Sequence, residues 1–192
     1  MASKRKSSYE VMKEYGIKPP SRSRVIRDIL NCTCYNVKIL ACLLYLTAGR
    51  ITEVLNIKTK DIEIEKDEAG FEYLNVKLMN EKNKTYKVKT TTSPIKYEKP
   101  LIDLVLNHCR DIPHEDNVCP FNTRSWAYIQ LKKFLPDYHF NHFFRALRLT
   151  NLVIDYNYQE IDLMNFAGWS DSRPFKHYQM YRSTKKFMEL MK

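Results

Sequence analysis

The stretch FEYLNVKL, residues 71–78, decides the fold class, because its apolar side chains recur with a period near two. The same alternation recurs at 62–64 and at 86–88, and polar, turn-forming segments at 67–70 and 80–84 separate the three pieces. We therefore predict three short antiparallel strands.

Helical periodicity flanks these strands on both sides. Between Val25 and Leu46 the apolar residues recur at spacings of three and four, which puts a wide apolar stripe on each helix. Further helices are predicted at 98–109, 123–134, 141–155, 160–166 and 173–181, with a last amphipathic piece that ends in Phe187, Leu190 and Met191. The expected fold class is α+β, a mostly helical single domain with a small three-stranded antiparallel sheet.

Composition limits the class of protein. A chain of 192 residues, 44% of them hydrophobic, is long enough to bury a core without disulfides or metal. The five cysteines are odd in number and scattered, with no CxxC pair, so we expect reduced core thiols and no metal site. Neither a run of about 18 apolar residues nor a secretory signal is present, so we expect a cytoplasmic protein with no membrane partner.

The net charge is +10, the balance expected of a protein that meets phosphates. Eight basic and two acidic residues lie within positions 1–27, so over half of the net charge is at this end. Residues 1–23, which include Pro19-Pro20, are predicted to be a basic, flexible arm, and residues 24–192 the folded domain. The arm fits either a segment that tracks a DNA backbone or a solubilising tail.

The segment TAGRITEVL, residues 47–55, places Arg50 and Glu53 three residues apart, on one face if the turn is helical. Glu53 would then hold Arg50, and Gly49 would ease a tight turn before the helix. A guanidinium fixed by a carboxylate presents a planar fork to a phosphate, although an exposed helix ion pair would have the same spacing.

The segment HFFRALRLT, residues 142–150, carries His142, Arg145 and, more obliquely, Arg148 on one side of an apolar helix. Phe144 and Leu147 belong to another side. The two interpretations are a functional cluster of His and Arg and a solvated basic face.

The third segment is FAGWS, residues 166–170, followed by Tyr178 nine positions after Trp169. Each of the three segments is weak evidence by itself. In this order and at these intervals, they resemble the motifs of the tyrosine recombinases, also called the phage integrase family, from about residue 25 to residue 182.

All three segments match the family motifs closely, and we call these motifs the first, second and third box in chain order. The family pattern Thr-Gly-x-Arg-x-x-Glu fits residues 47–53 with the Gly shifted by one position, and His-x-x-Arg fits His142 and Arg145. Gly-Trp with a Tyr nine further on fits Trp169 and Tyr178. Two departures exist: Ala146 stands where many members have His, and Arg148 with Thr150 is similar to the archaeal and archaeal-virus branch.

The resemblance also implies a catalytic Lys in the turn between the second and third strands, where Lys82 is the first choice and Lys84 the second. Tyr181 follows Tyr178 by three residues on nearly the same helical face, so it is the alternative nucleophile. Spacing from Trp169 favours Tyr178.

What the resemblance implies is DNA strand cleavage and rejoining through a 3′-phosphotyrosine, without metal, ATP or other cofactor. Arg50 and Arg145 would clamp the scissile phosphate, His142 and Trp169 would assist at it, and Lys82 would protonate the leaving oxygen. Glu53 would be supporting. The expected partner is double-stranded DNA, bound as a homo-tetramer on paired sites at full length, whereas the isolated domain can be a monomer.

Two other functions fit these residues. A type IB topoisomerase uses a similar catalytic set but religates within one duplex, and a non-catalytic DNA-binding fragment would keep the basic surface alone. Family members usually carry a further N-terminal helical domain, for which 192 residues leave no room. We therefore expect an isolated catalytic domain, a C-terminal fragment of a split gene or a naturally minimal enzyme. The last amphipathic piece would dock either on its own domain or on a neighbour.

Overall fold

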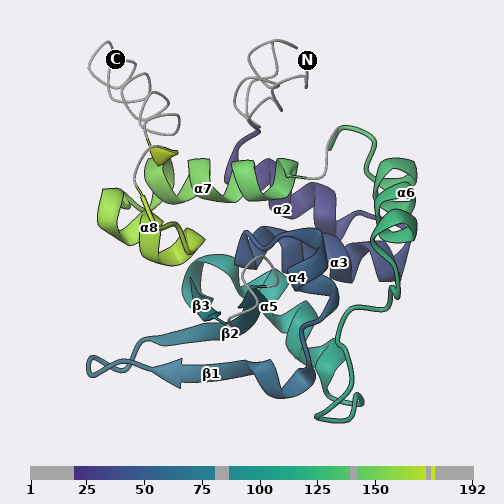
Figure 1. Cartoon of the computed structure of the whole chain (residues 1–192), viewed down its shortest axis with the longest axis horizontal. Helices are drawn as coiled ribbons and strands as arrows, with labels where there is room; N and C mark the ends of the chain where they lie inside the picture. Colours follow the sequence, from purple (N-terminus) through teal and green to yellow (C-terminus); the bar gives the residue numbers. More distant parts are fainter. Residues whose placement is uncertain (1–19, 81–86, 139–141, 172–173, 176–192) are drawn as a thin grey trace.

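The computed structural model describes residues 20–80, 87–138, 142–171 and 174–175 (Figure 1). The order of helices, sheet and helices is the one predicted from the sequence. The elements are α2 (Arg22–Leu30), α3 (Tyr35–Thr47), α4 (Ile51–Leu55), the 3-10 helix η1 (Thr59–Asp61), β1 (Ile62–Lys66), β2 (Glu72–Asn80), β3 (Lys87–Pro94), α5 (Ile95–Cys109), α6 (Arg124–Phe134), α7 (Phe143–Asp155) and α8 (Glu160–Ala167). The predicted arm lies mostly outside the described residues, as does most of the predicted helix at 173–181.

Helix α3 is the centre of the fold. Every residue from Ile39 to Ala48 is at most 2% exposed, because α2, α5, α6, α7 and β3 all pack around this helix. In Figure 1 it lies in the middle of the molecule, below α7. A helix that is apolar all round must be enclosed in this way.

The sheet is antiparallel with the order β1-β2-β3, as predicted. Its core face carries Leu74, Val76 and Leu78, each at most 1% exposed. Phe71 and Tyr73, which the period-two pattern grouped with Val76 and Leu78, point to the opposite face, and Phe71 is 64% exposed. The alternation identified the strand, but its apolar residues are divided between the two faces.

The buried thiols agree with the prediction from composition. All five cysteines are free; Cys34 is half-buried, and the other four are buried. Burial raises the pKa of Cys109 to about 11 and that of Cys119 to about 12, so these two thiols stay protonated at neutral pH. Among the described helices, none is both long and apolar enough to cross a membrane.

An ion pair lies entirely inside the core, between Glu98 of α5 and Arg148 of α7. Both side chains are 0% exposed, and the pair is bidentate, with a second contact of 2.9 Å from Nη2 to Oε2. Glu98 has non-helical backbone angles at a kink in α5, two residues before Pro100, whose ring and missing N–H interrupt the helix. The kink thus coincides with the residue that faces Arg148.

Neighbouring groups complete this pair. Ser93 Oγ accepts from Arg148 Nη2 at 3.1 Å, and the Tyr156 hydroxyl donates to Glu98 Oε1 at 2.9 Å. Burial lowers the pKa of the Arg148 guanidinium, but the carboxylate of Glu98, with smaller contributions from Tyr45 and Tyr156, outweighs burial, and the pKa is raised. The prediction that Arg148 belongs to the polar stripe of His142 and Arg145 is therefore wrong, because this guanidinium belongs to the core.

We predict that Glu98→Gln lowers the free energy of unfolding by about 3–5 kcal/mol, because it leaves a buried guanidinium without its counter-charge. Urea unfolding at pH 7 measures this. Glu115→Gln is the control, since Glu115 pairs with Lys58 and Lys60 at the surface, and its unfolding midpoint should match that of the wild type. Equal midpoints for the two variants would contradict the prediction.

Candidate active site

Arg50 stands at the N-cap of the short helix α4, and Glu53 of the same helix holds it twice. The Arg50 backbone N–H donates to Glu53 Oε2 at 2.8 Å, and Arg50 Nη1 donates to Oε1 at 2.5 Å. Glu53 is 3% exposed, whereas 32% of the Arg50 side chain faces solvent. The contact predicted from their spacing is present, and it fixes a guanidinium at the surface of the domain.

The turn that leads into Arg50 is tight. Ala48 ends α3 with φ of 47°, a left-handed conformation that favours glycine, and it occupies the position at which the first-box pattern has Gly. Gly49 follows, where a Cβ would lie 2.7 Å from Val54 Cγ2 and 2.9 Å from Thr47 Oγ1. Gly49 therefore permits close packing in this tight turn, without a left-handed backbone angle of its own.

Arg145 joins two distant segments. Its Nη1 donates to the backbone carbonyl of Ala48 at 2.5 Å, and its Nη2 donates to the carbonyl of Ala167 at 2.9 Å. The residue is 9% exposed, and its guanidinium carbon lies 5.9 Å from the centroid of the Trp169 ring. One side chain of α7 thus ties the turn before Arg50 to the end of α8.

The end of α8 is shaped by Gly168, which caps the helix with φ of 65°. The Gly168 N–H donates to Asn165 O, and the Trp169 N–H donates to Met164 O at 3.0 Å, so the chain turns sharply after the helix. Trp169 packs against a small apolar cluster that includes Ala48, Leu149, Leu152, Val153, Leu163, Phe166, Ala167 and Phe175. This cluster holds the first and third motifs together beside Arg145.

His142 is the residue before α7, and its carbonyl accepts from the Ala146 N–H at 2.9 Å. Its side chain is exposed, one helical turn before Arg145. The solvated-face interpretation of this helix fails for Arg145 and Arg148, which are both buried.

The remaining predicted residues cannot be placed in the same way. Lys82 and Lys84 fall between β2 and β3, and Tyr178 and Tyr181 follow Phe175; all four lie outside the described residues. The structure therefore brings together Arg50, Glu53, Arg145 and Trp169, with His142 at the start of the helix that carries Arg145.

Two other observations concern the surroundings of these residues. A hollow of about 390 Å³ opens between β3 and α8, and its lining consists of Thr92, Tyr158, Asp162, Asn165 and Phe166, none of them a predicted catalytic residue. Within the described ranges, no group of three or more His, Cys, Asp or Glu side chains is arranged to hold a metal ion.

Known structures share this arrangement of elements. The XerH site-specific recombinase bound to difH substrate in a pre-cleavage complex superposes with a TM-score of 0.61 at 16% identity, over 85% of this chain and 49% of that one. XerH bound to palindromic difH substrate in a post-cleavage complex gives a TM-score of 0.64, also at 16% identity, over 91% of this chain and 54% of that one.

The chain has the tyrosine recombinase catalytic-domain fold. It spans about half the length of these two recombinases. No protein-family model and no curated protein matches the sequence. At 16% identity, the structural similarity to XerH establishes the fold alone.

The functional contacts that sequence patterns missed are mainly backbone acceptors. The carbonyls of Ala48 and Ala167 bind Arg145, and no side-chain pattern marks a carbonyl. The positive φ of Ala48 could have been predicted from the sequence. The first-box pattern has Gly at position 48, one residue before Gly49, and Gly is the residue that favours a positive φ.

We predict that Arg145→Lys lowers the free energy of unfolding by about 1.5–3 kcal/mol, because one ammonium group cannot bridge both carbonyls as a planar fork does. Arg50→Lys is the matched control; its side chain is partly exposed and keeps a cation beside Glu53, so its cost should stay below about 1 kcal/mol. Unfolding in guanidinium chloride measures the loss of unfolding free energy in each variant. A larger loss for Arg50→Lys than for Arg145→Lys would contradict the prediction.

Proposed function

We propose that this chain is the catalytic domain of a tyrosine-type site-specific recombinase, which cuts and rejoins double-stranded DNA inside the cell. The observation that carries the proposal is the position of Arg145, which binds the turn before Arg50 and the segment before Trp169 at the same time. Three motifs that are far apart in the sequence thereby meet around one guanidinium, and the fold is that of DNA-bound site-specific recombinases.

The two arginines suit a phosphodiester. Arg50 is the more accessible, and Glu53 holds its guanidinium in a fixed orientation, which favours paired hydrogen bonds to phosphate oxygens. Arg145 lies deeper and would act from the floor of the site. Together they would stabilise the negative charge that builds on the non-bridging oxygens during phosphoryl transfer.

The covalent step belongs to Tyr178. Its phenolic group would give its proton to His142 while the oxygen attacks phosphorus and forms a 3′-phosphotyrosine. The displaced 5′ oxygen of the next nucleotide would take a proton from Lys82. The indole N–H of Trp169 would donate a hydrogen bond to the phosphate. Attack by a 5′ hydroxyl of another duplex reverses the step and rejoins the strands, so the bond energy is conserved without ATP.

The assembly follows from the reaction. Exchange between two duplexes needs four strand breaks, so we propose that the full-length protein acts as a homo-tetramer on paired sites. The net charge of +10 supports binding to the DNA backbone through phosphate contacts. The similarity of Arg148 and Thr150 to the archaeal and archaeal-virus branch is the basis for proposing a viral or mobile-element origin.

A nicked suicide duplex tests the nucleophile. The wild-type chain should give a protein–DNA adduct that survives denaturing electrophoresis, and Tyr178→Phe should abolish it because no phenolic oxygen remains to attack. Tyr181→Phe is the matched control and should retain the adduct. An adduct that persists in Tyr178→Phe and disappears in Tyr181→Phe would move the nucleophile three residues along.

The product separates this proposal from its rivals. Joint molecules between two labelled duplexes support recombination, whereas relaxed plasmid with no joint molecules indicates a topoisomerase. DNA binding with no adduct in the wild-type chain would leave only the non-catalytic fragment.

The general acid is tested with a DNA that carries a bridging sulfur in place of the scissile 5′ oxygen. A thiolate leaves without protonation, so Lys82→Ala should cleave ordinary DNA about 100-fold more slowly than the wild type and the sulfur substrate at nearly the wild-type rate. Lys84→Ala should cleave both at the wild-type rate. If the sulfur substrate rescues Lys84→Ala and not Lys82→Ala, the acid is Lys84.

A further inference from the structure

The start of α7 carries two of the proposed catalytic groups, His142 and Arg145. His142 makes no side-chain capping hydrogen bond, and the first turn of the helix contains no acidic residue. The two residues between His142 and Arg145 are Phe143 and Phe144, which are 1% and 4% exposed. What packs on these two rings therefore determines where the first turn lies.

Among the described residues, the ring of Tyr138 contacts both of them. Tyr138 stacks on Phe144 with centroids 4.7 Å apart and an interplanar angle of 5°, and it meets Phe143 edge-on at 5.6 Å and 85°. Both geometries are favourable for aromatic pairs. Tyr138 is itself 5% exposed, so its ring is fixed between the helix and the core.

The other end of Tyr138 is bound to a different helix. Its hydroxyl donates to Asp28 Oδ2 of α2 at 3.2 Å, and its backbone N–H donates to Leu135 O at 3.0 Å. Burial raises the pKa of the Tyr138 hydroxyl, and the carboxylate of Asp28 raises it further, so the hydroxyl remains a donor at neutral pH.

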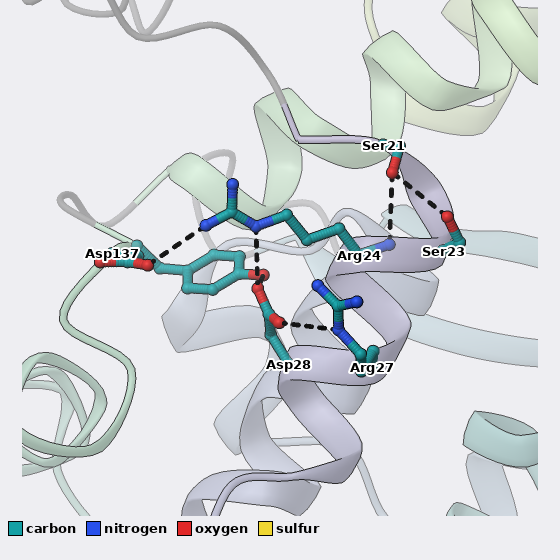
Figure 2. Close-up of polar contacts among 7 residues, drawn as sticks. Ser21, Ser23, Arg24, Arg27, Asp28 and Asp137 are labelled. Atoms are coloured by element: carbon teal, nitrogen blue, oxygen red, sulfur yellow. Dashed lines mark hydrogen bonds and ion pairs between the residues drawn. The ribbon is translucent and has the colours of Figure 1, made fainter.

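Asp28 is held in turn by two arginines of its own helix. Arg24 Nε lies 3.4 Å from Asp28 Oδ2, and Arg27 Nε lies 3.7 Å from Oδ1. Figure 2 shows Asp28 between these two guanidiniums, with Arg24 also reaching Asp137, the neighbour of Tyr138, at 3.4 Å. Helix α2 therefore contacts residues 137–138 twice, through Asp28 and through Arg24.

We propose that Tyr138, held by Asp28, is a positioning residue that sets the placement of His142 and Arg145 at the scissile phosphate. The inference rests on the proposed strand cleavage. A ring that is held by α2 at its hydroxyl and that packs on both phenylalanines fixes the first turn of α7 against α2. Displacement of a catalytic group by about 1 Å can slow a reaction by about 100-fold, so the anchor has a catalytic consequence beyond stability.

Three variants distinguish the hydroxyl contact of Tyr138 from its ring contacts. Tyr138→Phe removes only the hydroxyl contact, Tyr138→Leu also removes the ring contacts, and Asp28→Ala removes the acceptor. The control is Tyr35→Leu, because Tyr35 also joins two segments through its hydroxyl and ring, at 3.2 Å and 5.5 Å from His108, and this contact links α3 to α5.

Single-turnover cleavage at saturating suicide duplex should fall about tenfold or more in Tyr138→Leu and a few-fold in Tyr138→Phe. Asp28→Ala should be at least as slow as Tyr138→Phe, because it removes the acceptor of the Tyr138 hydroxyl and also the ion pairs with Arg24 and Arg27. The double variant should be no slower than Asp28→Ala, because the hydroxyl contact is already lost there. Dissociation constants for uncleaved duplex should stay within about twofold of the wild type. Tyr35→Leu should cleave at the wild-type rate.

A neutral substrate distinguishes positioning from general damage. A methylphosphonate at the scissile position has no negative charge for the arginine to stabilise, so the defect of Tyr138→Leu should shrink to about twofold on this DNA. An equal defect on charged and neutral substrates, or a loss confined to DNA binding, overturns the proposal.

Hydrogen exchange gives a readout that needs no activity. In Tyr138→Leu the first-turn amides of α7, including that of Ala146, should exchange about tenfold faster, while those of α3 keep the wild-type rate. Unchanged exchange at α7 overturns the anchoring whether or not the chain cuts DNA. A wild-type chain that forms no adduct overturns the proposed function, and exchange then decides separately whether Tyr138 fixes α7.

Discussion

The hydrogen bonds from Arg145 to the carbonyls of Ala48 and Ala167 are the constraint on which the site depends. A buried guanidinium must find acceptors, because an unpaired charge in the interior would be costly. The acceptors here belong to the two turns that carry the other motifs. The two hydrogen bonds that stabilise the buried guanidinium therefore also fix the distance between the first and third motifs. The same contacts thus serve both the stability of the fold and the geometry of the site.

Helix α7 presents two guanidiniums, three residues apart, to different surroundings. Arg148 meets a carboxylate and several aromatic rings and is fully enclosed, whereas Arg145 meets backbone carbonyls and the indole of Trp169 near the surface. The carboxylate of Glu98 pairs with Arg148 inside the core, whereas the carbonyls of Ala48 and Ala167 orient the guanidinium of Arg145.

Much of the fold could be predicted because it depends on local periodicity. The alternation at 71–78 identified the central strand, and the three-residue spacing of Arg50 and Glu53 predicted their contact. The partnership of Glu98 and Arg148 could not be predicted, since the two residues are fifty positions apart and meet only through the kink in α5 and the course of α7. The roles of Lys82 and Tyr178 stay predictions.

Every residue has a backbone carbonyl, whatever its side chain. The acceptors that hold Arg145 would therefore survive substitution at positions 48 and 167, provided that the two turns keep their course. Contacts of this kind constrain the course of the backbone more than the identity of the residues that supply the carbonyls. This is in keeping with a fold shared with the XerH recombinase at 16% identity.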